Sequence, residues 1–213
     1  MDTPRETVTR LRMERTAAAL RKNNMEAYCV DTAAEVVPLV RTLLQEGDVV
    51  AAGGGMSLTE TNVLDLLNSG AYQYLNRSKP GLTKDEIEKI YRDTFSADCY
   101  FASSNAVTEQ GELYNVDGNG NRVAAISFGP KRVILVVGCN KIVPDLDAAK
   151  ARVAQIAAPT NAVRLSCKTP CTVSGTCMNC KSPARICCTY VVQRYQRNAG
   201  RIHVILVGEA LGY

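Results

Sequence analysis

The sequence of 213 residues contains no tryptophan and only one histidine, and aromatic residues make up 6% of it. It offers no aromatic stripe on which nucleic-acid bases could stack. The single histidine, His203, lies in an apolar segment and is expected to be packed and hydrogen-bonded, so a zinc site here would consist of cysteines alone. No apolar run approaches the roughly 20 residues that a membrane-spanning helix requires, and we expect no membrane span.

Charge is also moderate. The net charge is +4, and no long run of lysine or arginine marks a nucleic-acid-binding face, so we expect no nucleic-acid partner. Residues 1–24 are charged throughout and lack the apolar core of a secretory signal, which predicts a cytoplasmic protein. The hydrophobic fraction of 46% is ordinary for a globular protein, and with this length it predicts a single domain over residues 1–213.

Cysteine, by contrast, is concentrated in one stretch. Six of the nine cysteines fall between Cys167 and Cys188, among Pro, Gly, Ser, Thr and Asn residues. A segment this poor in apolar side chains cannot order itself by packing, so a metal ion, a cluster or disulfides must hold it. Cys177 and Cys180 form a Cys-x2-Cys pair, which lets two thiolates converge on one ion from a tight turn. Because cytoplasmic thiols stay reduced, a metal or iron–sulfur site is favoured over disulfides or redox-active thiols.

The cysteine spacing alone does not decide between a [4Fe–4S] cluster and a zinc ion. The ferredoxin run Cys-x2-Cys-x2-Cys is absent, and no second Cys-x2-Cys pair completes a zinc ribbon. An all-cysteine zinc site leaves no open position for water, so zinc in this chain would be structural rather than catalytic.

Strand-like and helix-like segments alternate along the chain, which predicts an α/β domain whose mostly parallel sheet is flanked by helices. Strands are expected at 25–30, 48–52, 72–75, 98–103, 123–128, 132–137 and 202–207. Capping boxes predict helix starts at Thr3, Thr32, Ser57 and Thr83. A helix is expected over 145–157, ended by Pro159 and followed by a turn at 161–165. The Cys-rich loop, residues 166–189, is inserted before the last strand.

Three polar segments each follow a predicted strand: Gly53–Gly55, the segment around Asn105, and Gly138–Lys141. Gly53, Gly54 and Gly55 precede a helix, where backbone N–H groups can bind an anion, although neither the dinucleotide nor the P-loop fingerprint is met. Ligands of open α/β sheets bind at the carboxyl ends of the strands, so these segments are expected to form one pocket for a small carboxylate or phosphate. The alternative is that these residues only shape turns. The candidate ligand-binding residues are Gly53, Gly54, Gly55, Ser57, Asn105, Asp117, Asn121, Arg122, Asn140 and Lys141.

Four stretches resemble the LUD (lactate-utilisation) domain family: GGGMSLTET at 53–61, SSNAVTEQGELYNVDGNGNRV at 103–123, GPKRVILVVGCNKIV at 129–143 and PTNAVRL at 159–165. The Cys-rich segment and the closing VILVGEALGY resemble one cysteine-rich subgroup of that family. The resemblance covers nearly the whole chain. It implies a fold similar to the CoA-transferase and sugar-phosphate-isomerase superfamily, and a link to the oxidation of lactate to pyruvate by a system that contains iron–sulfur proteins.

The resemblance also implies particular site residues. Its metal ligands would be Cys171, Cys177, Cys180 and Cys187, with Cys167 and Cys188 outside the pattern, and the family context favours a [4Fe–4S] cluster over zinc. Related folds use a glutamate near the position of Glu109 to form acyl-CoA adducts, which makes Glu109 the candidate nucleophile or general base.

Three hypotheses follow from these features. The chain is an iron–sulfur component that acts with redox partner subunits, a CoA-transferase-like enzyme with catalytic Glu109 and a structural zinc site, or a ligand-binding or regulatory subunit. Assembly of the chain as a homo-oligomer is compatible with each of them.

Overall fold

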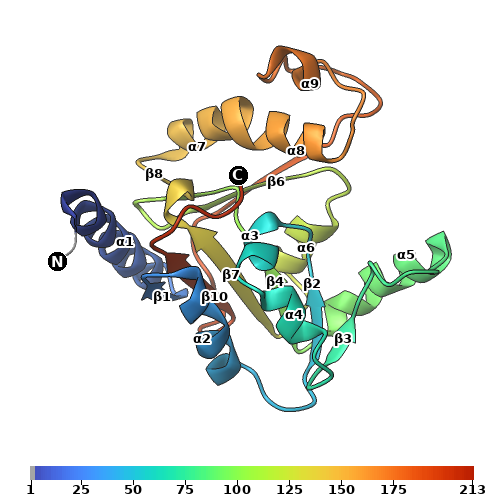
Figure 1. The fold of residues 1–213 in the computed structure, drawn as a ribbon, viewed down its shortest axis with the longest axis horizontal. Coiled ribbons are helices and arrows are strands. Elements are labelled where there is room, and N and C mark those ends of the chain that lie inside the picture. The colour runs from blue at the N-terminus through green and yellow to red at the C-terminus, as the bar shows by residue number, and fades with distance from the viewer. Residues whose placement is uncertain (1–2) are drawn as a thin grey trace.

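The computed structural model describes residues 3–213, in which helices and strands alternate along most of the chain (Figure 1). A π-helical segment, Val153–Ala157, joins α7 to α8. In chain order the elements are α1 (Pro4–Lys22), β1 (Glu26–Val30), α2 (Val36–Leu43), β2 (Val49–Ala52), α3 (Met56–Glu60), α4 (Val63–Leu67), β3 (Gln73–Leu75), α5 (Lys84–Asp93), β4 (Cys99–Ala102), β5 (Ala106–Thr108), β6 (Leu113–Asp117), α6 (Asn121–Ser127), β7 (Arg132–Gly138), β8 (Ile142–Val143), α7 (Leu146–Arg152), α8 (Ala158–Arg164), α9 (Cys171–Ser174), β9 (Thr189–Gln193) and β10 (Ile202–Val207).

Six strands form a fully parallel sheet in the order β1-β10-β7-β4-β2-β3. Alternate residues of β7 face opposite sides: Val133, Leu135 and Val137 pack with α1 and α6, while Ile134 and Val136 pack with α2, α3 and α4. Because both faces are covered, the central strands are apolar at nearly every position, with Arg132 of β7 and His203 of β10 as exceptions. The predicted α/β class, with a mostly parallel sheet flanked by helices, is confirmed.

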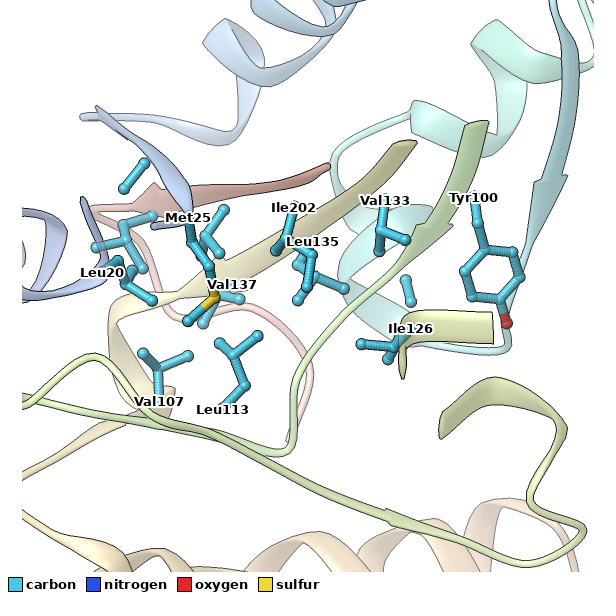
Figure 2. Packing of buried hydrophobic residues seen from close by; sticks show 14 of the residues in the cluster. Leu20, Met25, Tyr100, Val107, Leu113, Ile126, Val133, Leu135, Val137 and Ile202 are labelled. Carbon is cyan, nitrogen blue, oxygen red and sulfur yellow. The ribbon is translucent and has the colours of Figure 1, made fainter. Parts of the chain in front are cut away.

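A second sheet, in the order β8-β5-β6-β9, lies against the first. Its β5 and β6 form the hairpin expected in the Asn- and Gly-rich stretch. Figure 2 shows Val107 and Leu113 of this hairpin below Val137, in the cluster that also contains Leu20 of α1. The opposite side of the hairpin packs on α7 and the π-helical segment through Tyr114. Within residues 3–213, no helix is long and apolar enough to cross a membrane.

Two of the four predicted capping boxes form. Thr3 and Thr83 each accept a hydrogen bond from the backbone of a glutamate three residues on, whose carboxylate accepts one in return. The prediction for Ser57 is wrong, because the helix begins one residue earlier and the Ser57 hydroxyl is buried within it. Thr32 does not cap a helix either: its hydroxyl binds the Glu35 carboxylate.

The strand predicted at 123–128 is also wrong, since these residues belong to helix α6. The carboxylate of Asp117 accepts hydrogen bonds from the backbone N–H groups of Arg122 and Val123 and so satisfies the start of this helix. Val123 and Ile126, three residues apart, are the buried face. An apolar run this short fits either a strand or a helix, and the tertiary contacts decide between them.

Pro159 does not end the preceding helix, and residues 161–165 are not a turn. The chain passes through the π-helical segment into α8, where Pro159 occupies the first turn and needs no backbone donor. In π-helical register the missing N–H of Pro159 would have bound the carbonyl of Ala154. That carbonyl instead accepts a hydrogen bond of 2.9 Å from the backbone of Cys177. The proline thus leaves open an acceptor that anchors the Cys-rich loop.

Candidate functional site

The three polar segments predicted to meet do meet at the carboxyl edge of the parallel sheet. Gly53–Gly55 follows β2, Ser103–Asn105 follows β4 and Cys139–Lys141 follows β7. They are joined at Lys141, whose ammonium nitrogen lies 2.9 Å from Oγ of Ser57 and 3.0 Å from Oγ of Ser103. Above them opens a pocket of about 430 Å³.

Most of the predicted ligand-binding residues line this pocket. Gly54, Gly55, Asn105, Asp117, Asn121, Arg122 and Lys141 do so. Gly53, Ser57 and Asn140 lie outside the lining and support it. A side chain at Gly53 would place its Cβ 2.7 Å from the hydroxyl of Tyr100, so only glycine fits there. The Asn140 side chain holds the C-terminal tail by bonding the backbone of Leu211 and Gly212.

Lys141 is the most unusual group in the pocket, because it is a lysine only 3% exposed. Within residues 3–213 it forms hydrogen bonds to two serine hydroxyls and no salt bridge. Burial and, next, the neighbouring Arg152 lower the pKa of its ammonium group to about 7, against the opposing charge of Glu60. A buried cation without a carboxylate partner is costly to the fold, and an anionic ligand would supply the missing partner.

Both terminal nitrogens of the Arg122 guanidinium are hydrogen-bonded to protein groups. Its two terminal nitrogens bond the carbonyl of Ser103, the side chains of Asn105 and Asn115, and the carbonyl of Val116, at 2.6–2.9 Å. With these acceptors satisfied, Arg122 fixes the hairpin against the strand ends and adds a positive charge to the pocket. Burial lowers its pKa.

The lining carries a clear excess of positive charge. Among the described residues, five cationic side chains line the pocket against one carboxylate, Asp117, whose oxygen lies 3.7 Å from Nε of Arg122. The other three cations are Arg77, Arg164 and Arg185; within residues 3–213 they bond a tyrosine hydroxyl, an asparagine side chain, and backbone carbonyls together with Sγ of Cys187, respectively. An arginine-rich, partly enclosed pocket of this kind attracts carboxylates and phosphates.

Several of these residues carry no local sequence signal. Arg77, Arg164 and Arg185 come from three segments far apart in the chain and meet only in the folded protein. Arg152 is also buried, and it joins two of the loops by bonding the carbonyls of Asn105 at 2.7 Å and Asn140 at 3.0 Å. No spacing rule brings such residues together.

Glu109, the predicted nucleophile or general base, does not line the pocket. Its carboxylate lies against α1, 2.6 Å from Nε of Arg12 and 3.4 Å from Nη2 of Arg15. The hydrogen bond from Arg12 lowers its pKa, which holds the group as a paired carboxylate. The structure therefore separates Glu109 from the other candidate residues and gives it a role in docking the first helix.

The Cys-rich loop forms one wall of the pocket, through Arg185 and Ile186. Its cysteines are half-buried or exposed, and within residues 3–213 no three Cys, His, Asp or Glu side chains are grouped closely enough to hold a metal ion. His203, as expected, lies elsewhere: it stacks on Tyr28 and bonds the carbonyl of Gly200 at 2.9 Å.

The surroundings of the sulfurs nevertheless differ between the expected ligands and Cys188. The backbone N–H of Asn179 points at Sγ of Cys177 at 3.4 Å, from a residue in left-handed conformation with φ of 46°. Sγ of Cys171 lies 3.2 Å from the Thr169 hydroxyl, and Arg185 reaches Sγ of Cys187 at 3.6 Å. The Asn179 N–H and the Arg185 guanidinium donate to these sulfurs, whereas either atom of the Thr169–Cys171 contact can be the donor.

Cys188 has the opposite arrangement. Its sulfur is the donor, to the carbonyl of Arg185 at 3.6 Å, and its side chain is exposed. The donor chemistry thus fits a metal or cluster at Cys171, Cys177 and Cys187 and separates Cys188 from that set. Binding would have to draw the sulfurs together.

A parallel α/β sheet with a cationic pocket at the carboxyl ends of its strands defines an α/β protein with a candidate small-molecule site at a sheet edge. The model of the LUD domain family matches residues 13–207, and the chain belongs to that family. It is accordingly a protein of the lactate-utilisation type.

A solved structure gives the same fold. The chain is similar to the crystal structure of a DUF162 family protein from Deinococcus radiodurans, with a TM-score of 0.53 over 93% of this chain and 98% of that one. At 15% sequence identity this likeness supports the fold alone. No protein of curated function matches the chain.

Proposed function

We propose that this LUD-domain protein is an accessory or redox component of lactate oxidation. In this proposal it binds a small carboxylate at Lys141, beside a [4Fe–4S] cluster held by Cys171, Cys177, Cys180 and Cys187. The observation that carries the proposal is the shared wall: Arg185 lines the carboxylate pocket and also bonds the backbone of Cys180 and Cys187. Iron–sulfur partner subunits would then exchange electrons with the protein.

The proposal that the pocket binds a carboxylate is supported by the positive charge of its lining. Lys141 would receive the partner it lacks, and Arg77, Arg164 and Arg185 of the lining would hold the ligand by charge-assisted hydrogen bonds. Gly54 and Gly55 keep side chains out of the floor of the pocket. A phosphate has the same charge chemistry and remains an alternative ligand.

The proposal that the chain binds a cluster is supported by the surroundings of the sulfurs in the Cys-rich loop. When bound, an iron–sulfur cluster supplies one-electron transfer. The chain's contribution is to place polar groups at the sulfurs: the Asn179 N–H, the Thr169 hydroxyl and the Arg185 guanidinium each face one of them. An all-cysteine zinc site would use the same donors, and it is the alternative outcome of the test.

Metal analysis of protein purified anaerobically tests the cluster. We expect about four iron and four sulfide per chain with broad visible absorption. Replacement of Cys177 or Cys187 by serine should remove most of the iron, whereas Cys188→Ser should keep it, since that sulfur acts as a donor. One zinc per chain without visible absorption would replace the cluster by a structural zinc site.

Calorimetric titration with lactate, pyruvate and inorganic phosphate tests the pocket. Lys141→Met should weaken the binding of the preferred anion by about ten- to a hundredfold, the loss of one buried charge-assisted contact. Lys150→Met, which removes an exposed lysine on α7, is the matched control and should bind as the wild type does. Equal affinity of both variants would exclude Lys141 from the ligand site.

A further inference from the structure

The hydrogen bonds of Lys141 suit a neutral amine better than an ammonium ion. Ser57 donates its hydroxyl hydrogen to the carbonyl of Leu211 at 3.3 Å, and Ser103 donates to the carbonyl of Ser104 at 3.4 Å. Both serine oxygens are therefore left as acceptors for Lys141. Two acceptors match the two hydrogens of an NH₂ group. An ammonium group has a third hydrogen, for which residues 3–213 provide no acceptor.

We propose that Lys141 is a nucleophile that forms an imine with a 2-oxo acid bound in this pocket. With both N–H groups held by serines, the remaining tetrahedral position of the nitrogen is its lone pair, and Lys141 lines the pocket. The inference rests on the proposed function in one respect, that the pocket takes a small carboxylate. It adds the class of that ligand and a covalent role for the lysine.

The electrostatic surroundings support a reactive amine. Burial lowers the pKa of Lys141 to about 7, and the positive charges of Arg152 and Arg122 act in the same direction. Near neutral pH about half of the chains would then carry the free base. Desolvation together with adjacent cations is a recognised way to activate a lysine for attack on a carbonyl. Of these two arginines, Arg122 also lines the pocket, where its charge attracts the carboxylate of the ligand.

The step is balanced without an oxidant or a cofactor. The lone pair of Lys141 attacks the carbonyl carbon of the 2-oxo acid, and the carbonyl oxygen takes up a proton to give a carbinolamine. The carbinolamine hydroxyl then leaves as water together with the second amine hydrogen, and the C=N bond forms. The hydroxyls of Ser57 and Ser103, both in contact with the nitrogen, are placed to relay these protons. A 2-hydroxy acid such as lactate has no keto group to form an imine and can occupy the pocket only without covalent attachment.

Reductive trapping of the full-length protein tests the proposal. The protein is incubated at neutral pH with pyruvate, 2-oxobutyrate or glyoxylate and then treated with sodium borohydride, and the modified residue is located by peptide mass spectrometry. For pyruvate we expect one 1-carboxyethyl group per chain on Lys141, and an excess of lactate should reduce the labelling by competition. Lys141→Arg should lower the labelling at least tenfold, whereas Lys150→Arg should be labelled as the wild type is.

The outcomes separate this proposal from the one it rests on. If calorimetry detects binding of a small carboxylate but none of the three 2-oxo acids labels Lys141, the imine is refuted and the carboxylate pocket stands. If no small carboxylate binds and none labels Lys141, both proposals fail. Labelling spread evenly over exposed lysines would also overturn the imine at Lys141.

Discussion

Lys141 should make the stability of the protein depend on pH in a way that a neutral side chain at this position cannot. Burial lowers its pKa to about 7 in the folded protein, from the ordinary value of 10.5 that applies to the unfolded chain. Between these two values the unfolded state binds more protons than the folded state, so the free energy of unfolding rises with pH. Below the folded pKa both states carry the proton, and the cost of the buried charge is fully present.

The size of the effect follows from the linkage of one proton. For a folded pKa of about 7, stability should increase by about 1 kcal/mol between about pH 7 and about pH 8. The groups that set this pKa are Arg152 and Arg122, which lower it, and Glu60, which raises it. All three remain in a Lys141→Met variant, so the difference in pH dependence between variant and wild type reports the lysine alone.

Urea denaturation under reducing conditions measures this difference. The wild-type protein should gain about 1 kcal/mol more than Lys141→Met over that pH interval, whatever their absolute stabilities are. All other ionisable groups are common to both proteins, so their contributions cancel in the comparison. Parallel pH profiles for the two proteins would refute the reasoning, since they would mean that Lys141 keeps its proton when folded and already has an anionic partner.

Three further predictions concern groups around the site. Arg122→Met should cost about 3–5 kcal/mol in urea denaturation, because it leaves the buried oxygens around the guanidinium unpaired. Glu109→Gln should cost only about 0.5–1 kcal/mol, the worth of a partly exposed ion pair with α1, and should leave calorimetric binding at the pocket unchanged. Gly138→Ala should cost about 1–3 kcal/mol, because its Cβ would lie 2.4 Å from the backbone nitrogen of Leu211, whereas Gly55→Ala, with 3.9 Å to its nearest neighbour, should be much milder in the same denaturation assay.

The parts of the fold that sequence reasoning predicted correctly are those in which local and tertiary preferences agree. Residues 133–137 and 204–207 are apolar at every position, because strands covered by helices on both faces have no polar side. The meeting of Gly53–Gly55 with Lys141 follows from a general property of parallel sheets, the convergence of their strand ends at one edge. Neither prediction requires knowledge of individual side-chain contacts.

The errors arose where a distant group decides the local structure. Residues 123–128 have the composition of a strand, but the carboxylate of Asp117 caps them as a helix. Pro159 is a helix breaker by local rules, yet the π-helical segment before it removes the need for its N–H. The arginines of the pocket were missed for the same reason, since Arg77, Arg164 and Arg185 share a site but no sequence pattern. Glu109 was assigned by analogy with related folds, and its two arginine partners lie on α1.

The attachment of the Cys-rich loop has a thermodynamic consequence. The loop is tied to the pocket at two points: Cys177 bonds the π-helical segment through Ala154, and Cys188 bonds the carbonyl of Asp117 at 2.9 Å. Ile186 also lies beside Gly118, where a Cβ on the glycine would be in ordinary contact with the Ile186 backbone at 3.4 Å. A centre that gathers the sulfurs must therefore shift one wall of the pocket. If ligand affinity changes with the metal state of the loop, metal affinity must change by the same factor when the ligand binds. In that case the pocket at Lys141 and the cysteines are thermodynamically coupled. Metal bound at the cysteines can then be detected through ligand affinity, and ligand bound in the pocket through metal affinity.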